Sequence, residues 1–166
     1  MNLTILRFGN VKRVIIIVAS ILVLLIAAFI VSANFFQLML VQGDSMKPTI
    51  KDKALVVVDK RSDIYQVDDI IAFTCDGIKG VLVKRVVAVA GDKVQIKDGI
   101  LYVNDRPSSC QLKDKPINYA GLASEELVVP DGKLFVIGDN YNESKDSRYE
   151  EIGLIDKEDV IGRVME

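Results

Sequence analysis

Histidine is absent from the sequence, and its absence excludes several kinds of catalytic site. A serine or cysteine nucleophile that uses histidine as its general base is ruled out, as is any zinc site with histidine ligands. A serine nucleophile in this chain therefore needs another base, and lysine is the main candidate. A lysine can act as a base only where burial makes its ammonium group lose a proton.

Cysteine is scarce, and an excess of positive charge is missing. Cys75 and Cys110 form no Cys-x-x-Cys pair and cannot build a zinc site by themselves. They could form a disulfide if the domain lies outside the cell, or remain two unrelated thiols. The 166 residues carry a net charge of −2, so nothing in the charge balance indicates nucleic acid as a partner. We expect neither a metal nor a cofactor, and the length suits one domain with a small annex.

One long apolar run lies near the N-terminus. Residues 14–33 are apolar apart from two serines, which is about the length that crosses a bilayer as a helix. Residues 1–13 contain three basic residues and no acid, and no Lys or Arg follows the run until Lys47. By the positive-inside rule, we expect residues 1–13 to be cytoplasmic and residues 34–166 to lie outside the cell membrane.

The alternative to a membrane anchor is a cleaved secretory signal. The apolar core of such a signal is normally shorter than this run, which favours an uncleaved anchor. Residues 31–33, Val-Ser-Ala, nevertheless have the small side chains of a cleavage site. Slow self-cleavage after Ala33 is a weaker hypothesis suggested by the same residues.

From residue 54 onward, short runs rich in Val and Ile alternate with Asp, Lys and Gly, a pattern typical of strands. We expect strands at 54–58, 69–74, 80–90, 94–96, 100–103, 133–137 and 160–165. The Lys-Asp-Gly sequence at 97–99 predicts a hairpin. Residues 34–41 stay apolar and would either end a tilted helix or form a strand. The polar residues 106–126 are interpreted as a surface excursion.

These patterns predict a mainly β fold. One N-terminal transmembrane helix would precede an extracytoplasmic antiparallel β-sheet domain at residues 34–166. A small annex of strands and loops is expected within it, at about residues 91–132.

A short polar segment follows the apolar run and precedes the strands. Residues 43–50 read Gly-Asp-Ser-Met-Lys-Pro-Thr-Ile, and Pro48 stops any helix from continuing through them. A serine in a tight bend at the end of a strand can present its hydroxyl to solvent, with backbone N–H groups facing the same point. Ser45 is therefore a candidate nucleophile. The alternative is an ordinary polar turn, in which Gly-Asp-Ser is common.

Two adjacent cations lie within a run that is apolar on both faces. Residues 80–90 read Gly-Val-Leu-Val-Lys-Arg-Val-Val-Ala-Val-Ala, which is typical of a buried strand, where an unpaired charge is costly. Strand alternation places Lys84 on one face with three apolar residues, Leu82, Val86 and Ala88. Arg85 faces the other way and requires a carboxylate partner. Lys84 can lose its proton, because apolar neighbours and the adjacent Arg85 lower a lysine pKa. The alternative is a lysine that extends from an edge strand to water.

A polar loop follows the strand expected at 133–137. Residues 138–148 read Gly-Asp-Asn-Tyr-Asn-Glu-Ser-Lys-Asp-Ser-Arg, which offers carboxylates for Arg85 and hydroxyls for Lys84. Such a loop could equally be an exposed turn or a weak cation site, but it lacks the spacing of an EF-hand calcium loop.

The apolar anchor and these three segments, in this order, resemble the bacterial type I signal peptidase (leader peptidase) family. That family has a Ser-Met-x-Pro-Thr segment, matched here by residues 45–49, and a Lys-Arg-Val-Val segment ending in Gly-Asp, matched by residues 84–92. A Gly-Asp-Asn…Ser-x-Asp-Ser-Arg segment follows, matched by residues 138–148. Each motif alone is a weak signal, whereas the ordered set is specific. The single anchor and the short insert between the last two motifs are similar to the compact Gram-positive form.

The resemblance implies a membrane-bound serine endopeptidase with a Ser/Lys dyad that removes signal peptides from translocated preproteins. It implies cleavage after small residues in Ala-x-Ala-like sites. Ser45 would be the nucleophile and Lys84 the general base, and Ser144 would hydrogen-bond and orient the lysine amine. The implied partners are preproteins, the lipid bilayer and a nearby secretion translocon.

The resemblance also implies how the site is supported. Pairs formed by Asp139 with Arg85 and by Asp146 with Arg148 would buttress it. Other residues would lie around the substrate pocket and the oxyanion hole: Gly43, Asp44, Met46 and the apolar residues of 35–41.

Three positions depart from the family pattern. Gly43 stands where some members carry a serine thought to help the oxyanion hole, so backbone N–H groups, including that of Ser45, would have to suffice. Tyr141 replaces the usual Arg, and Ala90 replaces the usual Pro. These two changes put the local support of the site in doubt and leave the chemistry unaffected.

Two other functions fit parts of the pattern. A self-cleaving, repressor-type protease uses a similar Ser/Lys pair on a related β fold, but such proteins are cytosolic and DNA-linked, which the anchor argues against. A non-enzymatic β domain tethered to the membrane would instead bind extracytoplasmic partners. That second alternative predicts that Ser45 and Lys84 lie far apart, so the distance between their side chains discriminates the two classes.

Overall fold

The computed structural model describes residues 3–110 and 115–165 of the chain. The chain divides into two compact units, Met1–Phe36 and Gln37–Glu166. The segment 1–13, expected in the cytoplasm, and the excursion expected at 106–126 each lie partly outside the described residues.

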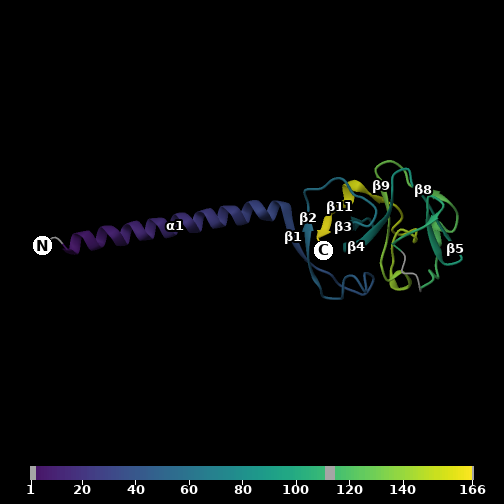
Figure 1. Cartoon of the computed structure of the whole chain (residues 1–166), viewed down its shortest axis with the longest axis horizontal. Helices are drawn as coiled ribbons and strands as arrows, with labels where there is room; N and C mark the ends of the chain where they lie inside the picture. The colour runs from purple at the N-terminus through teal and green to yellow at the C-terminus, as the bar shows by residue number, and fades with distance from the viewer. Residues whose placement is uncertain (1–2, 111–114, 166) are drawn as a thin grey trace. The chain divides into compact units, whose positions relative to one another are not determined.

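The first unit consists of helix α1, Leu3–Phe35 (Figure 1). Within it, the 21 residues Val11–Val31 have a mean hydropathy of 3.5, and none of them is buried against other parts of the chain. At about 1.5 Å per residue this stretch is about 30 Å long, which matches the hydrocarbon core of a bilayer. Among the described residues, α1 is the one helix whose length and composition suit a membrane span.

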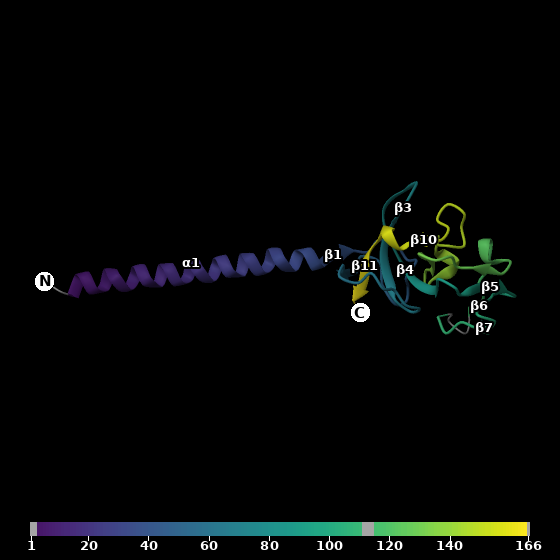
Figure 2. The same ribbon diagram turned by 90° about the horizontal axis from the view of Figure 1, so that it is seen from above.

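The larger of two β-sheets has seven strands in the order β1-β2-β11-β3-β4-β9-β10 (Figures 1 and 2). The strands are β1 (Phe36–Leu40), β2 (Leu55–Asp59), β3 (Ile70–Cys75), β4 (Ile78–Val89), β9 (Lys133–Ile137), β10 (Ile155–Asp156) and β11 (Val160–Met165). The pairs from β2 across to β10 are antiparallel. Their Val, Ile and Phe side chains suit a pleated surface packed against a core.

The smaller sheet has four strands in the order β7-β6-β5-β8. The strands are β5 (Lys93–Lys97), β6 (Ile100–Val103), β7 (Arg106–Pro107) and β8 (Leu127–Val128), all within the range 91–132 expected to form an annex. Strands β5 and β6 form the hairpin predicted from residues 97–99. Asp98 and Gly99 have φ values of 50° and 76°, as the two central residues of a type I′ turn require.

Short 3₁₀ helices complete the second unit: η1 (Gly121–Ala123), η2 (Tyr141–Glu143) and η3 (Lys157–Asp159). A mainly β, antiparallel fold after one N-terminal apolar helix is therefore confirmed. The segment 34–41 contains both alternatives considered for it, because α1 continues to Phe35 and β1 begins at Phe36.

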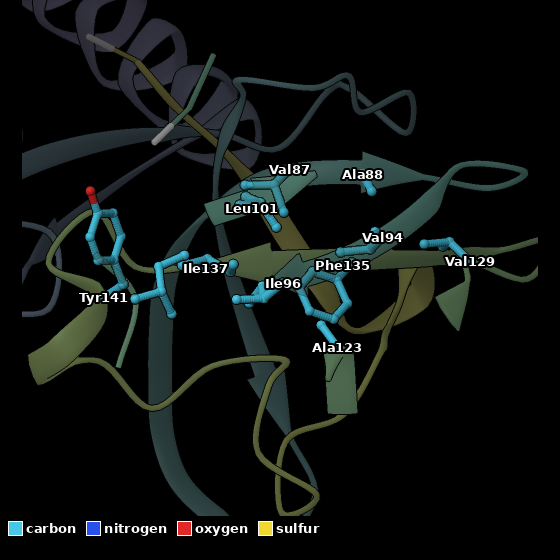
Figure 3. Close-up of a cluster of buried hydrophobic side chains, with 11 residues drawn as sticks. Val87, Ala88, Val94, Ile96, Leu101, Ala123, Val129, Phe135, Ile137 and Tyr141 are labelled. Carbon is cyan, nitrogen blue, oxygen red and sulfur yellow. The ribbon is translucent and has the colours of Figure 1, made fainter. Parts of the chain in front are cut away.

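Buried apolar side chains join the two sheets in one cluster. Figure 3 shows this cluster, in which Val87 and Phe135 of the larger sheet lie with Ile96 and Leu101 of the smaller one. Two further clusters lie within the larger sheet. One of them contains Met46 and the other contains Val86, so strands and turns near the candidate residues rest on packed cores.

Strand β4 carries an irregularity that simple alternation does not predict. Its register against β9 shifts between Val86 and Ala88, so Val87 is an extra residue there. A one-residue insertion reverses the facing of the side chains beyond it. Val86 packs in one cluster, and Ala88 packs with Val87 in the cluster that joins the sheets. The expectation that Ala88 shares the face of Lys84 was therefore wrong.

The interpretation of residues 106–126 as a surface excursion was wrong for two residues. Ile117 and Ala123 are 4% and 0% exposed and belong to the cluster that joins the sheets. They are isolated apolar residues in a polar stretch, so no hydrophobic periodicity reveals them.

Candidate active site

Ser45 lies in the turn between β1 and β2, and backbone hydrogen bonds fix this turn. The N–H of Lys47 donates to the carbonyl of Asp44 at 3.1 Å, and the N–H of Ile50 donates to the carbonyl of Met46 at 2.9 Å. Met46 is 1% exposed and anchors the turn in a core cluster. Ser45 itself is half-buried, so its hydroxyl is held by a rigid turn and remains accessible.

Lys84 lies on β4 with its amine beside the Ser45 hydroxyl. Its Nζ is 2.8 Å from Ser45 Oγ and donates to the carbonyl of Val83 at 3.0 Å. The side chain is 3% exposed. Burial lowers the pKa of Lys84 to about 8. At neutral pH about one Lys84 amine in ten is then neutral, against about one in 10³ for a free lysine.

One expectation about the pKa of Lys84 needs correction. Arg85 was expected to lower it by repulsion, but the lowering comes from burial. The carboxylates of Asp146 and Asp139 raise the pKa of Lys84 and partly oppose the effect of burial, even though each is paired with an arginine.

Arg85 and Asp139 form a bidentate ion pair next to these residues. Arg85 Nε and Nη2 donate to Asp139 Oδ1 and Oδ2, each at 2.8 Å. Arg85 Nη1 also donates to the carbonyl of Asp68 at 2.8 Å, and Thr49 Oγ1 donates to Asp139 Oδ2. Asp139 therefore connects three segments that are distant in sequence: the turn after β1, strand β4 and the loop after β9.

Asp146 and Arg148 form a second bidentate pair, whose side chains are 0% exposed. Arg148 Nε donates to Asp146 Oδ1 at 2.7 Å and Nη2 donates to Oδ2 at 2.9 Å. Arg148 also donates to the carbonyls of Tyr119, Tyr141 and Ser144. The hydrogen bonds of this buried guanidinium go to residues of the loop after β9 and to the carbonyl of Tyr119. The pair therefore holds the loop in place.

The Ser144 hydroxyl does not make the hydrogen bond to Lys84 that was expected. Ser144 is 3% exposed, and its Oγ has no hydrogen-bond partner in the described part of the chain. It packs against Gly138, where a Cβ atom would collide with both Ser144 Oγ and the carbonyl of Ser45. Ser144 therefore lies close to the Ser45 turn, and its orienting role stays a prediction.

Asn140 holds the Ser45 turn, although no sequence pattern singled it out as a site residue. Its backbone N–H donates to the carbonyl of Ser45 at 2.9 Å, and its side-chain amide donates to the carbonyl of Asp44 at 3.1 Å. Thr49 was missed in the same way. Both residues stand inside quoted motifs, but their partners lie some 90 residues away, so only the folded chain reveals them.

Two residues expected around the oxyanion hole, Gly43 and Asp44, already make other contacts. The N–H of Gly43 (φ 94°) already donates to Asp52 Oδ1 at 2.8 Å, and exposed Asp44 pairs with Lys47 at 2.8 Å. The N–H of Ser45, in contrast, makes no hydrogen bond within residues 3–110 and 115–165. It is the backbone donor available beside the Ser45 hydroxyl.

A cleft of about 400 Å³ leads to Ser45 and Lys84. One wall is formed by residues 39–42 and the other by residues 79–84 of β4. The first wall contains the apolar Met39, Leu40 and Val41, whereas Met46, which was expected around the pocket, is buried and does not line the cleft. Strand β9 pairs with β4 only from Arg85 onward, so within the described residues the β9 side of 78–84 is an unpaired strand edge.

Three other reactive side chains do not line this cleft: Ser147, Cys75 and Cys110. Ser147, a serine of the loop after β9 that would be an alternative nucleophile to Ser45, is 0% exposed and accepts a hydrogen bond from the N–H of Val136 at 3.0 Å. Cys75 and Cys110 are both free thiols. No group of three potential metal ligands comes together among the described residues.

Comparison with known proteins gives consistent matches. The family model for signal peptidase, peptidase S26, matches residues 13–166. Signal peptidase I of Bacillus licheniformis is 37% identical over 89% of this chain and 81% of its own length. Signal peptidase I U of Bacillus subtilis (strain 168) is 32% identical over 89% of this chain and 83% of its own. A solved signal peptidase I from Enterococcus faecalis V583 is 29% identical, with a TM-score of 0.49, and covers 61% of this chain and 97% of its own.

Proposed function

Because the chain belongs to the signal peptidase family, peptidase S26, we propose that it removes signal peptides with Ser45 as nucleophile and Lys84 as general base. Membership of this family makes the chain a serine protease that acts on preproteins carrying signal peptides. The catalytic pair, the cleavage specificity and the membrane orientation are the parts that we propose.

One observation carries the proposal: Ser45 Oγ and Lys84 Nζ are 2.8 Å apart, and Lys84 is buried. A general base must lie within hydrogen-bond reach of the proton that it removes, and its pKa must approach the working pH. The pair meets the first condition, and the pKa of about 8 supports the second. A non-enzymatic β domain would have no need for a buried lysine amine at hydrogen-bond distance from the Ser45 hydroxyl.

The chemistry follows from these positions. The neutral Lys84 amine takes the Ser45 proton as Oγ attacks the scissile carbonyl carbon, and the N–H of Ser45 stabilises the resulting oxyanion. The Lys84 ammonium then gives its proton to the leaving amine as the peptide bond breaks, which leaves an acyl-enzyme. Lys84 next removes a proton from water as the water oxygen attacks the ester carbonyl carbon. It returns that proton to Ser45 Oγ as the ester bond breaks, which releases the carboxylic acid product and restores Ser45.

The free edge of β4 would bind the substrate as an added strand. The peptide would run in the cleft between residues 39–42 and 79–84. Pockets lined by closely packed side chains, among them Met39 and Val41, would accept small residues one and three positions before the cut. Efficient cleavage after Leu or Phe in a peptide series would contradict this specificity.

We propose that α1 anchors the protein in the membrane with residues 1–13 in the cytoplasm and residues 34–166 outside. The basic residues before the apolar run and the lack of any until Lys47 support this orientation. The bilayer and a nearby translocon would then be the partners that deliver preproteins to the site. The anchor also argues against the cytosolic, repressor-type alternative.

Replacement of Ser45 tests the proposal directly. The full chain in detergent should cut a preprotein at one site, Ser45→Ala should abolish the cut, and Lys84→Arg should abolish it too, because a guanidinium does not give up its proton. Ser147→Ala is the control for the alternative nucleophile. Gel and mass analysis of the products measures all four proteins, and normal turnover by Ser45→Ala or Lys84→Arg would overturn the assignment.

A further inference from the structure

The cleft carries one charge that the proposed mechanism does not use. Lys79 lines the cleft near the start of β4, at the end away from Lys84. Its side chain is exposed, and it makes no ion pair or side-chain hydrogen bond with residues 3–110 or 115–165. A cation with no partner inside a substrate cleft is available to a ligand.

The position of Lys79 determines which part of a substrate it would meet. Lys79 and Lys84 are five residues apart on one strand, which corresponds to about 16 Å at a rise of about 3.3 Å per residue. An extended peptide along this edge, with its scissile bond at Ser45, would bring its residue about five positions from the cut beside Lys79. The same cleft would hold the residues one and three positions before the cut, so Lys79 would face the part of the substrate that precedes the cut.

The remaining lining does not compensate this charge. The residues that line the cleft include two charged side chains, both lysines, and no carboxylate. Because Lys84 is buried and partly neutral, Lys79 is the exposed source of positive potential in the cleft. An acidic substrate side chain would be attracted there, and a basic one would be repelled.

We propose that Lys79 is a specificity-determining residue, which favours an acidic side chain and disfavours a basic one about five residues before the cut. This inference rests on the proposed function of the cleft and adds a charge preference to its preference for small residues near the cut.

A matched peptide series tests the inference on the full chain in detergent. The peptides share one Ala-x-Ala cleavage site and differ only at the fifth residue before the cut, which is Asp, Asn or Lys; sets with the change at the fourth and sixth residues locate the contact. For wild type we expect kcat/KM to fall by roughly two- to fivefold from Asp to Asn and again from Asn to Lys, as for an exposed ion pair. The differences should shrink in about 0.5 M salt.

Three variants separate charge recognition from other effects. Lys79→Gln should remove the discrimination among the Asp, Asn and Lys peptides, and Lys79→Glu should reverse the order. Lys60→Gln, an exposed lysine outside the cleft, is the matched control and should keep the wild-type order. Discrimination that survives in Lys79→Gln, or equal cleavage of all peptides by wild type, would overturn the inference and leave the proposed function intact. Failure of wild type to cut any peptide or preprotein would overturn both.

Discussion

The two aspartate–arginine pairs have the same chemistry but differ in burial and in the distance between their partners along the chain. Asp146 and Arg148 are two residues apart, and both side chains are 0% exposed. Asp139 and Arg85 are 54 residues apart, and their side chains are 9% and 15% exposed. The first pair closes one loop upon itself, whereas the second pair connects the strand of Lys84 with the loop after β9 and with the Ser45 turn.

This difference predicts that the Asp146–Arg148 pair mainly stabilises the fold, whereas the Asp139–Arg85 pair mainly aligns Ser45 with Lys84. A fully buried charge that loses its partner remains in the core without compensation, which makes the buried pair costly to break. The Arg85–Asp139 pair keeps some contact with solvent, so a partner left alone can regain water and the loss costs less stability. Its loss would instead free two segments that hold Ser45 and Lys84 at hydrogen-bond distance.

Removal of Arg148 should give the largest loss of stability. Arg148→Met leaves Asp146 buried without its partner and leaves three loop carbonyls without their donor. We expect the free energy of unfolding to fall by about 3–5 kcal/mol. The chain contains no tryptophan, so urea unfolding of the full chain in detergent is best followed by circular dichroism.

The matched control for Arg148→Met is Lys93→Met. Lys93 pairs with Glu126 at 2.9 Å, but both side chains are nearly half exposed. A change below about 1 kcal/mol is expected there. Equal losses in the two variants would show that burial does not distinguish them.

Replacement of Asp139 should affect activity more than stability. Asp139→Asn keeps the shape of the side chain but removes the charge that binds Arg85 through two hydrogen bonds. Misplacement of a catalytic group by about 1 Å can cost on the order of 100-fold in rate. We expect kcat/KM to fall by about 10- to 100-fold and the free energy of unfolding to fall by about 1–3 kcal/mol. A variant that unfolds as readily as Arg148→Met would remove the distinction between the two pairs.

Much of this architecture was predictable, because local sequence determines it. Runs of Val and Ile located the strands, and Asp-Gly located the hairpin between β5 and β6. Position-specific and long-range features were not predictable in the same way. A bulge at Val87 moves Ala88 to another face, and buried Ile117 gives no periodic signal.

In the candidate site, too, local features were predictable and long-range contacts were not. Ser45 and Lys84 were selected by the bend, by the buried strand and by a family resemblance. The hydrogen bonds from Asn140 to the Ser45 turn cross about 95 residues, and no local pattern encodes them. Ser144 shows the limit of the resemblance, since the expected contact with Lys84 is not among its contacts in the described chain.

The pH profile of activity tests the effect of the Asp139 carboxylate on Lys84. Activity should rise with pH through about 8, because Lys84 is a base only when it is neutral and burial lowers its pKa to about that value. Asp139 raises the pKa of Lys84, so Asp139→Asn should move the midpoint to lower pH even as it lowers the maximum. Values of kcat/KM measured from pH 5 to 10 give both the midpoint and the maximum of each profile. A midpoint that moves upward would contradict the sign of this interaction.

Thr49→Val should have the smallest effect and tests the contact between the Ser45 turn and Asp139. The exposed Thr49 hydroxyl donates to Asp139 Oδ2, which keeps its bond from Arg85 when the hydroxyl is removed. A hydrogen bond to a charged group contributes about 1.5–3 kcal/mol, and water can replace part of it at this exposed position. We therefore expect kcat/KM to fall by roughly two- to tenfold with little change in unfolding.

Thr74→Val is the control for Thr49→Val, since the Thr74 hydroxyl is also exposed but donates to the carbonyl of Asp159, at 3.4 Å, instead of to Asp139. The double variant Thr49→Val with Asp139→Asn decides the mechanism. If Thr49 acts through Asp139, the loss in the double variant should be smaller than the product of the two single losses, because both changes weaken one connection. Independent, multiplicative losses would mean that the turn is held by its own backbone and by Asn140, and that Asp139 serves β4 alone.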